Sequence, residues 1–111
     1  MYKVGQGVLG KITFKDGVEP SYNRTYLIIK VNGTDISVLN VSSLKGKERK
    51  LAFPSNYKID NYNPPFDFPS FAKLDSLTTV SESFINSNCR LLRGGALLSS
   101  TDINNILKKL T

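Results

Sequence analysis

The sequence of 111 residues contains no histidine and only one cysteine, Cys89. Without histidine the chain cannot build a histidine-based catalytic triad, a histidine general base or a typical His/Cys zinc site. A lone cysteine excludes an internal disulfide and is typical of a reducing compartment, which predicts a cytoplasmic protein. We expect Cys89 to be a small buried residue, because no histidine is present to activate its thiol.

The patterns of common nucleotide and metal sites are also missing. The sequence has neither a GxxxxGK[ST] loop nor a GxGxxG loop, and its nine carboxylates are scattered along the chain. We therefore expect no bound metal and no cofactor. No apolar signal segment or membrane-spanning run occurs, which predicts no membrane association. An enzyme of this composition must take its acid, base and charge stabilisers from Arg, Lys, Asp, Glu, Ser, Thr or Tyr.

Basic residues outnumber acidic ones by fifteen to nine, which gives a net charge of +6. Such an excess favours a polyanionic partner, with nucleic acid as the first candidate and an acidic protein segment as the second. Small basic proteins without either partner are common, so charge alone does not decide between them. The length predicts a single domain that spans residues 1–111.

Short apolar runs separated by turn residues predict a mainly β fold. The expected strands cover residues 7–14, 25–31, 36–41, 50–55, 70–77 and 89–99. Gly10 is expected to mark a bulge or a close approach, and residues 57–69 an ordered loop after a short strand. Residues 78–88 can form a helical turn. Together these elements predict a compact, partly open barrel.

The C-terminal segment predicts an α-helix that closes the chain. Ser99 or Ser100 can cap it, and Asp102 lies in its first turn. Its apolar residues recur at helical spacing and form one stripe: Ile103, Ile106, Leu107 and Leu110.

The strongest hairpin signal is Asn32-Gly33, between two β-branched runs. A two-residue turn there places Arg24 opposite Val41, and a four-residue turn places Arg24 opposite Ser43. Either register brings a guanidinium near hydroxyl groups at the open end of a hairpin, which suits a phosphate. The alternative is an arginine that pairs with a carboxylate beside serines that only open a loop.

A basic loop follows the serines directly. Its cations are Lys45, Lys47, Arg49 and Lys50. Such a loop can hold a nucleic-acid backbone, although most charge runs of this kind are solvated tips. Of the aromatic residues that follow, we expect Phe66, Phe68 and Phe71 to pack the loop onto the barrel rather than to stack on bases.

Several segments together resemble the MazF/PemK family of ribonuclease toxins from bacterial toxin–antitoxin systems. They are GQGVLGKITF, NRTYLIIK, ISVLNVSS, PSFAKLDSLTTVSES and GGALLSSTDINNILKKL, which span nearly the whole chain in patches. Arg24 matches the family's arginine, and Ser42 and Ser43 match its Thr-Ser pair. The chain departs from the pattern at Thr25, where the family usually has proline, in serine for threonine, and in a short first loop.

The resemblance implies an SH3-like, partly open barrel that dimerises and cleaves single-stranded RNA without a metal. It implies Arg24, Ser42, Lys73 and Asp75 as the catalytic residues, with Lys73 and Asp75 in the places of an Arg–Asp acid–base pair of the PemK-like branch. The substrate-binding residues would be Tyr22, Ser43, Lys45, Lys47, Arg49 and Lys50. An acidic antitoxin would be the protein partner.

Two other classes of function stay open at this point. A barrel of the same fold can bind RNA or protein without catalysis, since the proline is missing and position 73 is lysine. A third possibility is a poison of a protein target such as DNA gyrase, which is found on this barrel in another toxin family.

Overall fold

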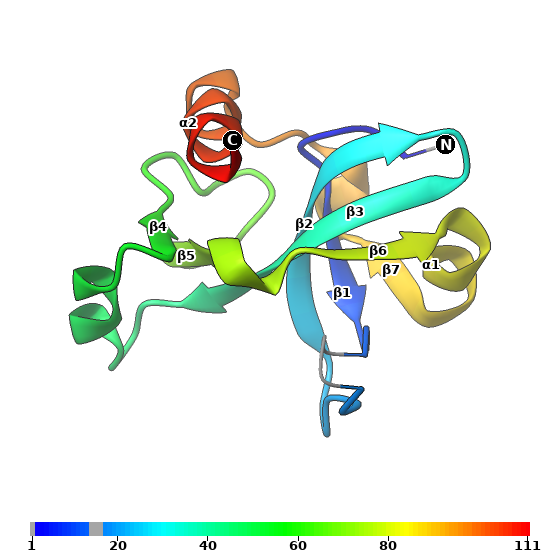
Figure 1. Ribbon diagram of the computed structural model, residues 1–111, viewed down its shortest axis with the longest axis horizontal. Coiled ribbons are helices and arrows are strands. Elements are labelled where there is room, and N and C mark those ends of the chain that lie inside the picture. The colour runs from blue at the N-terminus through cyan, green and yellow to red at the C-terminus, as the bar shows by residue number, and fades with distance from the viewer. Residues whose placement is uncertain (1, 14–16) are drawn as a thin grey trace.

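A computed structural model describes residues 2–13 and 17–111 (Figure 1). Its seven strands are β1 (Gly7–Gly10), β2 (Arg24–Asn32), β3 (Asp35–Ser43), β4 (Asn56–Lys58), β5 (Ser70–Lys73), β6 (Thr78–Ser81) and β7 (Cys89–Leu91). The α-helices are α1 (Glu82–Asn88) and α2 (Ser100–Leu110), and three 3₁₀ helices connect strands: η1 (Glu48–Ala52), η2 (Leu74–Ser76) and η3 (Leu92–Gly95).

All strand pairs are antiparallel, and the order across the sheet is β4-β5-β3-β2-β1-β7. Strand β6 pairs with the first half of β3, whereas β5 pairs with its end. The sheet does not close on itself. This architecture confirms the predicted mainly β fold, a partly open barrel with a C-terminal helix.

The β2–β3 hairpin begins in the register of the predicted four-residue turn, with Val31 opposite Ile36, and departs from it before the open end. Asn32 pairs with Asp35, so Gly33 and Thr34 form the turn, and Gly33 has the positive φ of +61° that glycine tolerates. A bulge between Ile28 and Lys30 then shifts the pairing by one residue. Thr25 consequently lies opposite Val41, and both predicted registers are wrong at the open end.

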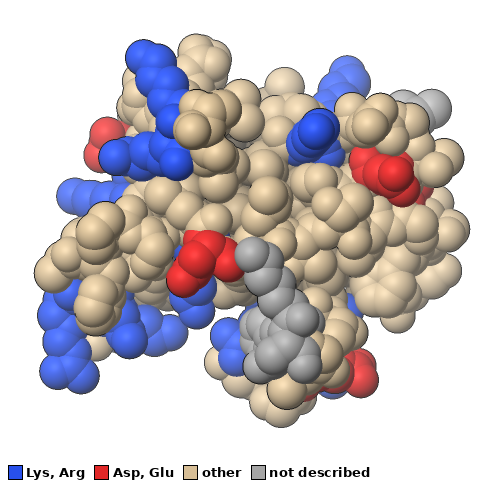
Figure 2. Space-filling model, in the orientation of Figure 1, with Lys and Arg blue, Asp and Glu red and all other residues tan. Residues whose placement is uncertain are grey.

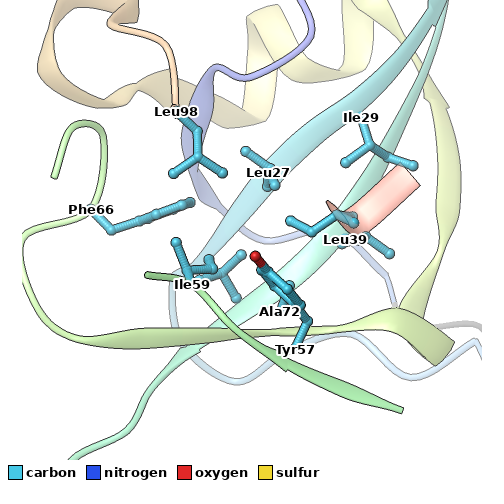
Figure 3. Close-up of a cluster of buried hydrophobic side chains, with 10 residues drawn as sticks. Leu27, Ile29, Leu39, Tyr57, Ile59, Phe66, Ala72 and Leu98 are labelled. Carbon is cyan, nitrogen blue, oxygen red and sulfur yellow. The ribbon is translucent and has the colours of Figure 1, made fainter. Parts of the chain in front are cut away.

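The two faces of this hairpin bury two different clusters. Leu27, Ile29, Leu39 and Val41 face a cluster that the 59–69 loop and α2 complete through Ile59, Phe66 and Ile106 (Figure 3). On the other face Tyr26, Ile28, Ile36 and Val38 pack against Ile85 of α1. The alternation of side chains along each strand produces this division.

Helix α2 is capped by Ser99, whose Oγ accepts a hydrogen bond from the Asp102 backbone N–H at 3.2 Å. Asp102 itself is 1 % exposed and accepts from the Tyr57 hydroxyl and from the backbone N–H groups of Asp60 and Asn61. The predicted cap and first-turn acid are confirmed. Ile106 of the predicted apolar stripe is buried, whereas Leu107 is exposed.

Four predicted strands differ from the observed ones. Strand β1 ends at Gly10, short of the predicted residues 11–13, and Phe14 lies outside the described residues. Residues 48–52 form η1 instead of a strand at 50–55, because this polar stretch buries no side chain. The predicted 70–77 strand ends at Lys73, and the predicted 89–99 strand ends at Leu91.

Two smaller predictions concern Gly10 and Cys89. A Cβ on Gly10 would lie 2.4 Å from the Asn88 carbonyl oxygen, so the expected close approach is confirmed. Cys89 is half-buried rather than buried, because β7 is an edge strand. Burial nevertheless raises the pKa of its thiol, which makes it a weaker nucleophile.

Candidate functional site

One face of the β2–β3 hairpin is apolar near α1 and polar at the open end of the hairpin. Where α1 covers it, the inward residues of β2 and β3 are apolar, as in Tyr26 and Val38. Toward the open end of the hairpin, the same alternation places Arg24, Asn40 and Ser42 on this face. The last pair of the hairpin toward its open end is Thr25 with Val41. One residue further along each strand, Arg24 lies opposite Ser42. At the open end this face therefore carries polar residues, whereas the other half of the face carries a hydrophobic core.

Arg24 and its neighbours line a pocket of about 190 Å³, which we call the Arg24 pocket. Its lining comprises Tyr22, Asn23, Arg24, Thr25, Asn40, Val41, Ser42, Ser43 and Lys47. Five of the ten predicted site residues thus meet here: Tyr22, Arg24, Ser42, Ser43 and Lys47. A guanidinium, an ammonium and hydroxyl groups around one small volume are suited to a phosphate.

The Arg24 guanidinium is supported from one side by an aromatic ring. Its Cζ lies 4.5 Å from the centroid of the Tyr22 ring, within the range of a cation–π contact. As a whole residue, Tyr22 remains 58 % exposed. Tyr22 is therefore placed to orient Arg24 and still present a free ring face at the rim of the pocket.

A second pocket of about 450 Å³, the Lys73 pocket, adjoins the first through Lys47, which lines both. Lys50, Phe53, Lys73 and Asp75 also line it. Ser42 pairs with Phe71 on β5, and Lys73 follows two residues later, so Lys73 shares the face of Ser42. The predicted residues Lys50, Lys73 and Asp75 meet in this pocket.

Asp75 does not lie on a strand as predicted; it lies in η2 and is exposed. Burial lowers the pKa of Lys73, and the positive charges of Arg24, Lys47 and Lys50 lower it further, while Asp75 acts in the opposite sense. Between described residues, the ion pair in this structure is Arg93 with Asp67, so Lys73 and Asp75 do not pair. The balance around Lys73 is therefore positive.

The 3₁₀ turn that carries Asp75 is fixed to β3 by Ser76. The Ser76 hydroxyl accepts a hydrogen bond from the Asn40 backbone N–H at 2.8 Å and donates to the Lys73 carbonyl at 2.6 Å. Strand β3 pairs with β6 up to Val38 and with β5 from Val41 onward, so Asn40 lies between the two pairings. The Ser76 hydroxyl supplies the hydrogen-bond acceptor that a neighbouring strand would otherwise give there. Ser76 thereby sets the position of both Lys73 and Asp75 relative to the hairpin.

The basic loop extends these pockets along the surface. Figure 2 shows Lys and Arg side chains gathered over the end of the molecule that carries η1. Lys45, Lys47, Arg49 and Lys50 are all exposed there. Lys47 lines both pockets and Lys50 lines the Lys73 pocket, whereas Lys45 and Arg49 line neither.

Asn40 is the residue of the site that the sequence interpretation missed. It is 4 % exposed, its Nδ2 donates to the Thr25 carbonyl, and its Oδ1 accepts no hydrogen bond from the described residues. Asn40 thus places an unused acceptor in the wall of the Arg24 pocket. The sequence does contain a sign of this role, because Asn40 is a polar residue within the apolar run ISVLNV. A buried polar side chain in a strand is expected to have a hydrogen-bonding or functional role.

Comparison with models of known protein families gives no match for this chain, and comparison with curated proteins gives none either. Within residues 2–13 and 17–111, no helix is long and apolar enough to cross a membrane. The same residues contain no group of three or more cysteine or carboxylate side chains placed to hold a metal ion.

Proposed function

We propose that the protein is a metal-independent endoribonuclease of the MazF/PemK type, which cleaves single-stranded RNA. The observation that carries the proposal is the convergence of Arg24, Ser42 and Lys47 on one pocket beside Lys73. These residues come from three separate segments of the chain. Their types match what a phosphodiester requires: charge, a planar fork of donors and a hydroxyl donor.

The proposed reaction is attack of a ribose 2′-hydroxyl on the adjacent phosphorus. The 2′-oxygen loses its proton to a base and bonds to phosphorus, and the bond to the 5′-oxygen then breaks. The departing 5′-oxygen takes a proton from an acid, which leaves a 2′,3′-cyclic phosphate and a 5′-hydroxyl. Asp75 is the proposed base and Lys73 the proposed acid. Arg24 and Ser42 stabilise the charge that develops on the phosphorane oxygens.

The local electrostatics support a bound anion. Burial lowers the pKa of Lys73, and the positive charges of Arg24, Lys47 and Lys50 lower it further. A phosphate in the Arg24 pocket would relieve that repulsion. The lowered pKa also brings the Lys73 ammonium closer to the range in which a lysine transfers protons near neutral pH.

Thr25 compensates for the proline that the family usually has after its arginine. Its Oγ1 donates a 2.7 Å hydrogen bond to the Val41 carbonyl across the hairpin. Proline would restrict the backbone beside Arg24, and this side-chain bond restricts it in another way. The departure at position 25 therefore does not argue against a fixed Arg24.

The proposal includes the partners that the resemblance implies. An acidic antitoxin would cover the basic surface around η1 and the Arg24 pocket, and a net charge of +6 would speed its encounter. The active form would be a cytoplasmic homodimer. Edge strands β4 and β7 offer unpaired backbone for symmetric association.

Incubation of the purified protein with a long RNA in EDTA tests the proposal. We expect cleavage at defined sites, with 2′,3′-cyclic phosphate and 5′-hydroxyl ends. Contaminating ribonucleases can produce the same ends, so the Arg24→Ala variant, purified in parallel, is the control and should be inactive. Binding of RNA without cleavage would instead support the non-catalytic alternative, and cleavage by both proteins would reject the site.

A further inference from the structure

We propose that a third pocket, next to the Arg24 pocket, binds one nucleobase of the RNA by stacking it on Phe68. We call it the Phe68 pocket; its volume is about 280 Å³. The inference depends on the proposed function for its ligand class, single-stranded RNA. It adds the residues that would bind a base, whereas the Arg24 pocket would bind the backbone.

Part of the lining of the Phe68 pocket is a row of side chains across three strands. Arg90 on β7 pairs with Leu9 on β1, and Leu9 pairs with Thr25 on β2. All three line the pocket and share the sheet face of the α2 cluster, because Thr25 lies opposite Val41. At this end the face is open, and Arg90 is exposed.

Phe68 also lines the pocket and is unusually exposed for its type. Phe66 and Phe71 are buried at 3 % and 1 %, as predicted, whereas Phe68 is 67 % exposed, so the prediction that it packs the loop is wrong. Its backbone is nevertheless fixed. The Phe68 carbonyl accepts from the Ser70 hydroxyl at 2.6 Å, and the next carbonyl, of Pro69, accepts from the Leu44 N–H.

A second restraint lies directly before Phe68. Arg93 donates from both Nε and Nη2 to the Asp67 carboxylate and forms an ion pair with it. This pair neutralises the acid that lines the pocket, so Arg90 contributes the uncompensated charge there. An exposed ring on a fixed backbone, in a pocket that a cation also lines, suits a base better than an apolar peptide side chain, because every base has a π-face and acceptor atoms on its edge.

The Phe68 pocket is continuous with the Arg24 pocket. Thr25 and Ser43 line both, since they stand at the open end of the hairpin where the two faces of the sheet meet. An RNA strand that places a phosphate beside Arg24 can therefore pass over this rim. The base of that nucleotide or of its neighbour then reaches the ring of Phe68.

Binding of a short single-stranded RNA with 2′-O-methyl riboses tests this inference without cleavage. The probe contains all four bases, and a series replaces each base in turn by an abasic sugar. We expect Phe68→Ala and Phe68→Leu to weaken binding about tenfold, because both remove the stacking face. Phe68→Tyr should bind like the wild type. Leu107→Ala, an exposed apolar change on α2, is the matched control.

The abasic series identifies the stacked base. One abasic position should weaken binding to the wild type about tenfold and should have no further effect on Phe68→Ala. Wild-type affinity in Phe68→Ala, or an abasic loss of the same size in both proteins, would overturn the base pocket. If RNA is cleaved but Phe68 has no effect, only the base pocket fails. If RNA binds through Phe68 without ever being cleaved, only the nuclease proposal fails, and a wild type that binds no RNA contradicts both.

Discussion

The two ends of the molecule surround a buried or half-buried charged side chain differently: hydrogen-bond donors surround a carboxylate at one end, and like charges surround an ammonium at the other. At the α2 end, Asp102 is buried, and donors from Ser99, Tyr57, Asp60 and Asn61 surround its carboxylate. At the open end of the hairpin, the half-buried Lys73 has three cations as neighbours and one exposed carboxylate.

The pKa directions express the same contrast. Burial alone would raise the pKa of Asp102, but its hydrogen bonds outweigh burial and lower the pKa. Burial lowers the pKa of Lys73, and the surrounding charges add to that effect. The first arrangement stabilises the charged form within the fold, whereas the second would be stabilised by an anion from outside. Four variants, a pH series of unfolding curves and an NMR titration with RNA can distinguish the two ends experimentally.

The largest expected effect is on catalysis, from Arg24→Ala. We expect cleavage to fall by about a thousandfold or more, because this change removes charge and paired donors from the phosphate at once. Lys30→Ala, an exposed change on the same strand, is the control and should cleave normally. Initial rates at saturating RNA and thermal unfolding of both variants provide the comparison. Normal cleavage by folded Arg24→Ala would remove the proposed active site.

The next effect is on stability, from Asp102→Ala. It leaves the Tyr57 hydroxyl and two backbone N–H groups without their acceptor, which should cost about 3 kcal/mol of the free energy of unfolding. Asn104→Ala, exposed on the same helix, should change it little. Urea unfolding of the two variants measures the difference. A cost as small as that of the control would mean that Asp102 does not anchor α2.

The pH dependence of stability gives Asp102 a second test. Its pKa is lowered from 3.8, so its contribution is fully present above pH 3.8 and is lost as the pH falls through the lowered value. Tyr57 behaves in the opposite sense. Its pKa is raised to about 12 by burial, so the stability it contributes is present below pH 10 and is lost as the pH rises toward 12. Unfolding curves across both ranges should show two losses.

A smaller effect is expected from the basic loop. Replacing Lys45, Lys47, Arg49 and Lys50 by Ala should weaken RNA binding and reduce the slope of log K against log salt by about 2 to 3. Cleavage at saturating RNA should change little except through Lys47, which lines the Arg24 pocket. Restoring Lys47 in the variant separates these roles. An unchanged salt slope would show that the loop is a solvated surface.

The smallest expected effect is a shift in the pH profile of cleavage. If Lys73 donates the proton, activity should fall as the pH rises through a pKa that lies below the usual lysine value of 10.5. Lys73→Arg keeps the charge and raises that pKa, so the alkaline limb should move to higher pH. Rate measurements over the alkaline range test this, and an unmoved limb would assign the acid to another group.

The sequence predicts the hairpin, the capped helix and the mainly β fold because these depend on local signals. Asn-Gly, β-branched runs and a serine cap act within a few residues of each other. The register at the open end of the hairpin could not be predicted, since the bulge at Ile28–Lys30 depends on how both faces of β2 fill two separate cores. Likewise, Asp75 lies in η2 and not in the predicted strand, because the side chain of Ser76, rather than a backbone group, forms the hydrogen bond to β3.

The residues of the candidate site divide in the same way into those that local sequence signals predict and those that tertiary packing decides. Arg24 and Ser42 could be assigned to one place because a hairpin brings its open ends together whatever its register. Asn40 could not, because its place in the pocket wall depends on the face that the bulge selects. Phe68 was misassigned because aromatic type alone does not show which rings of a loop face the core and which face solvent.

The most direct test of the contrast between the two ends is an NMR titration of the protein with non-cleavable, 2′-O-methylated single-stranded RNA. We expect the amide shifts of Asn23–Thr25, Asn40–Ser43 and Lys47 to change and those of α2 to stay the same. Shift changes confined to α2 and the Asp102 region, with the open end of the hairpin unaffected, would contradict it.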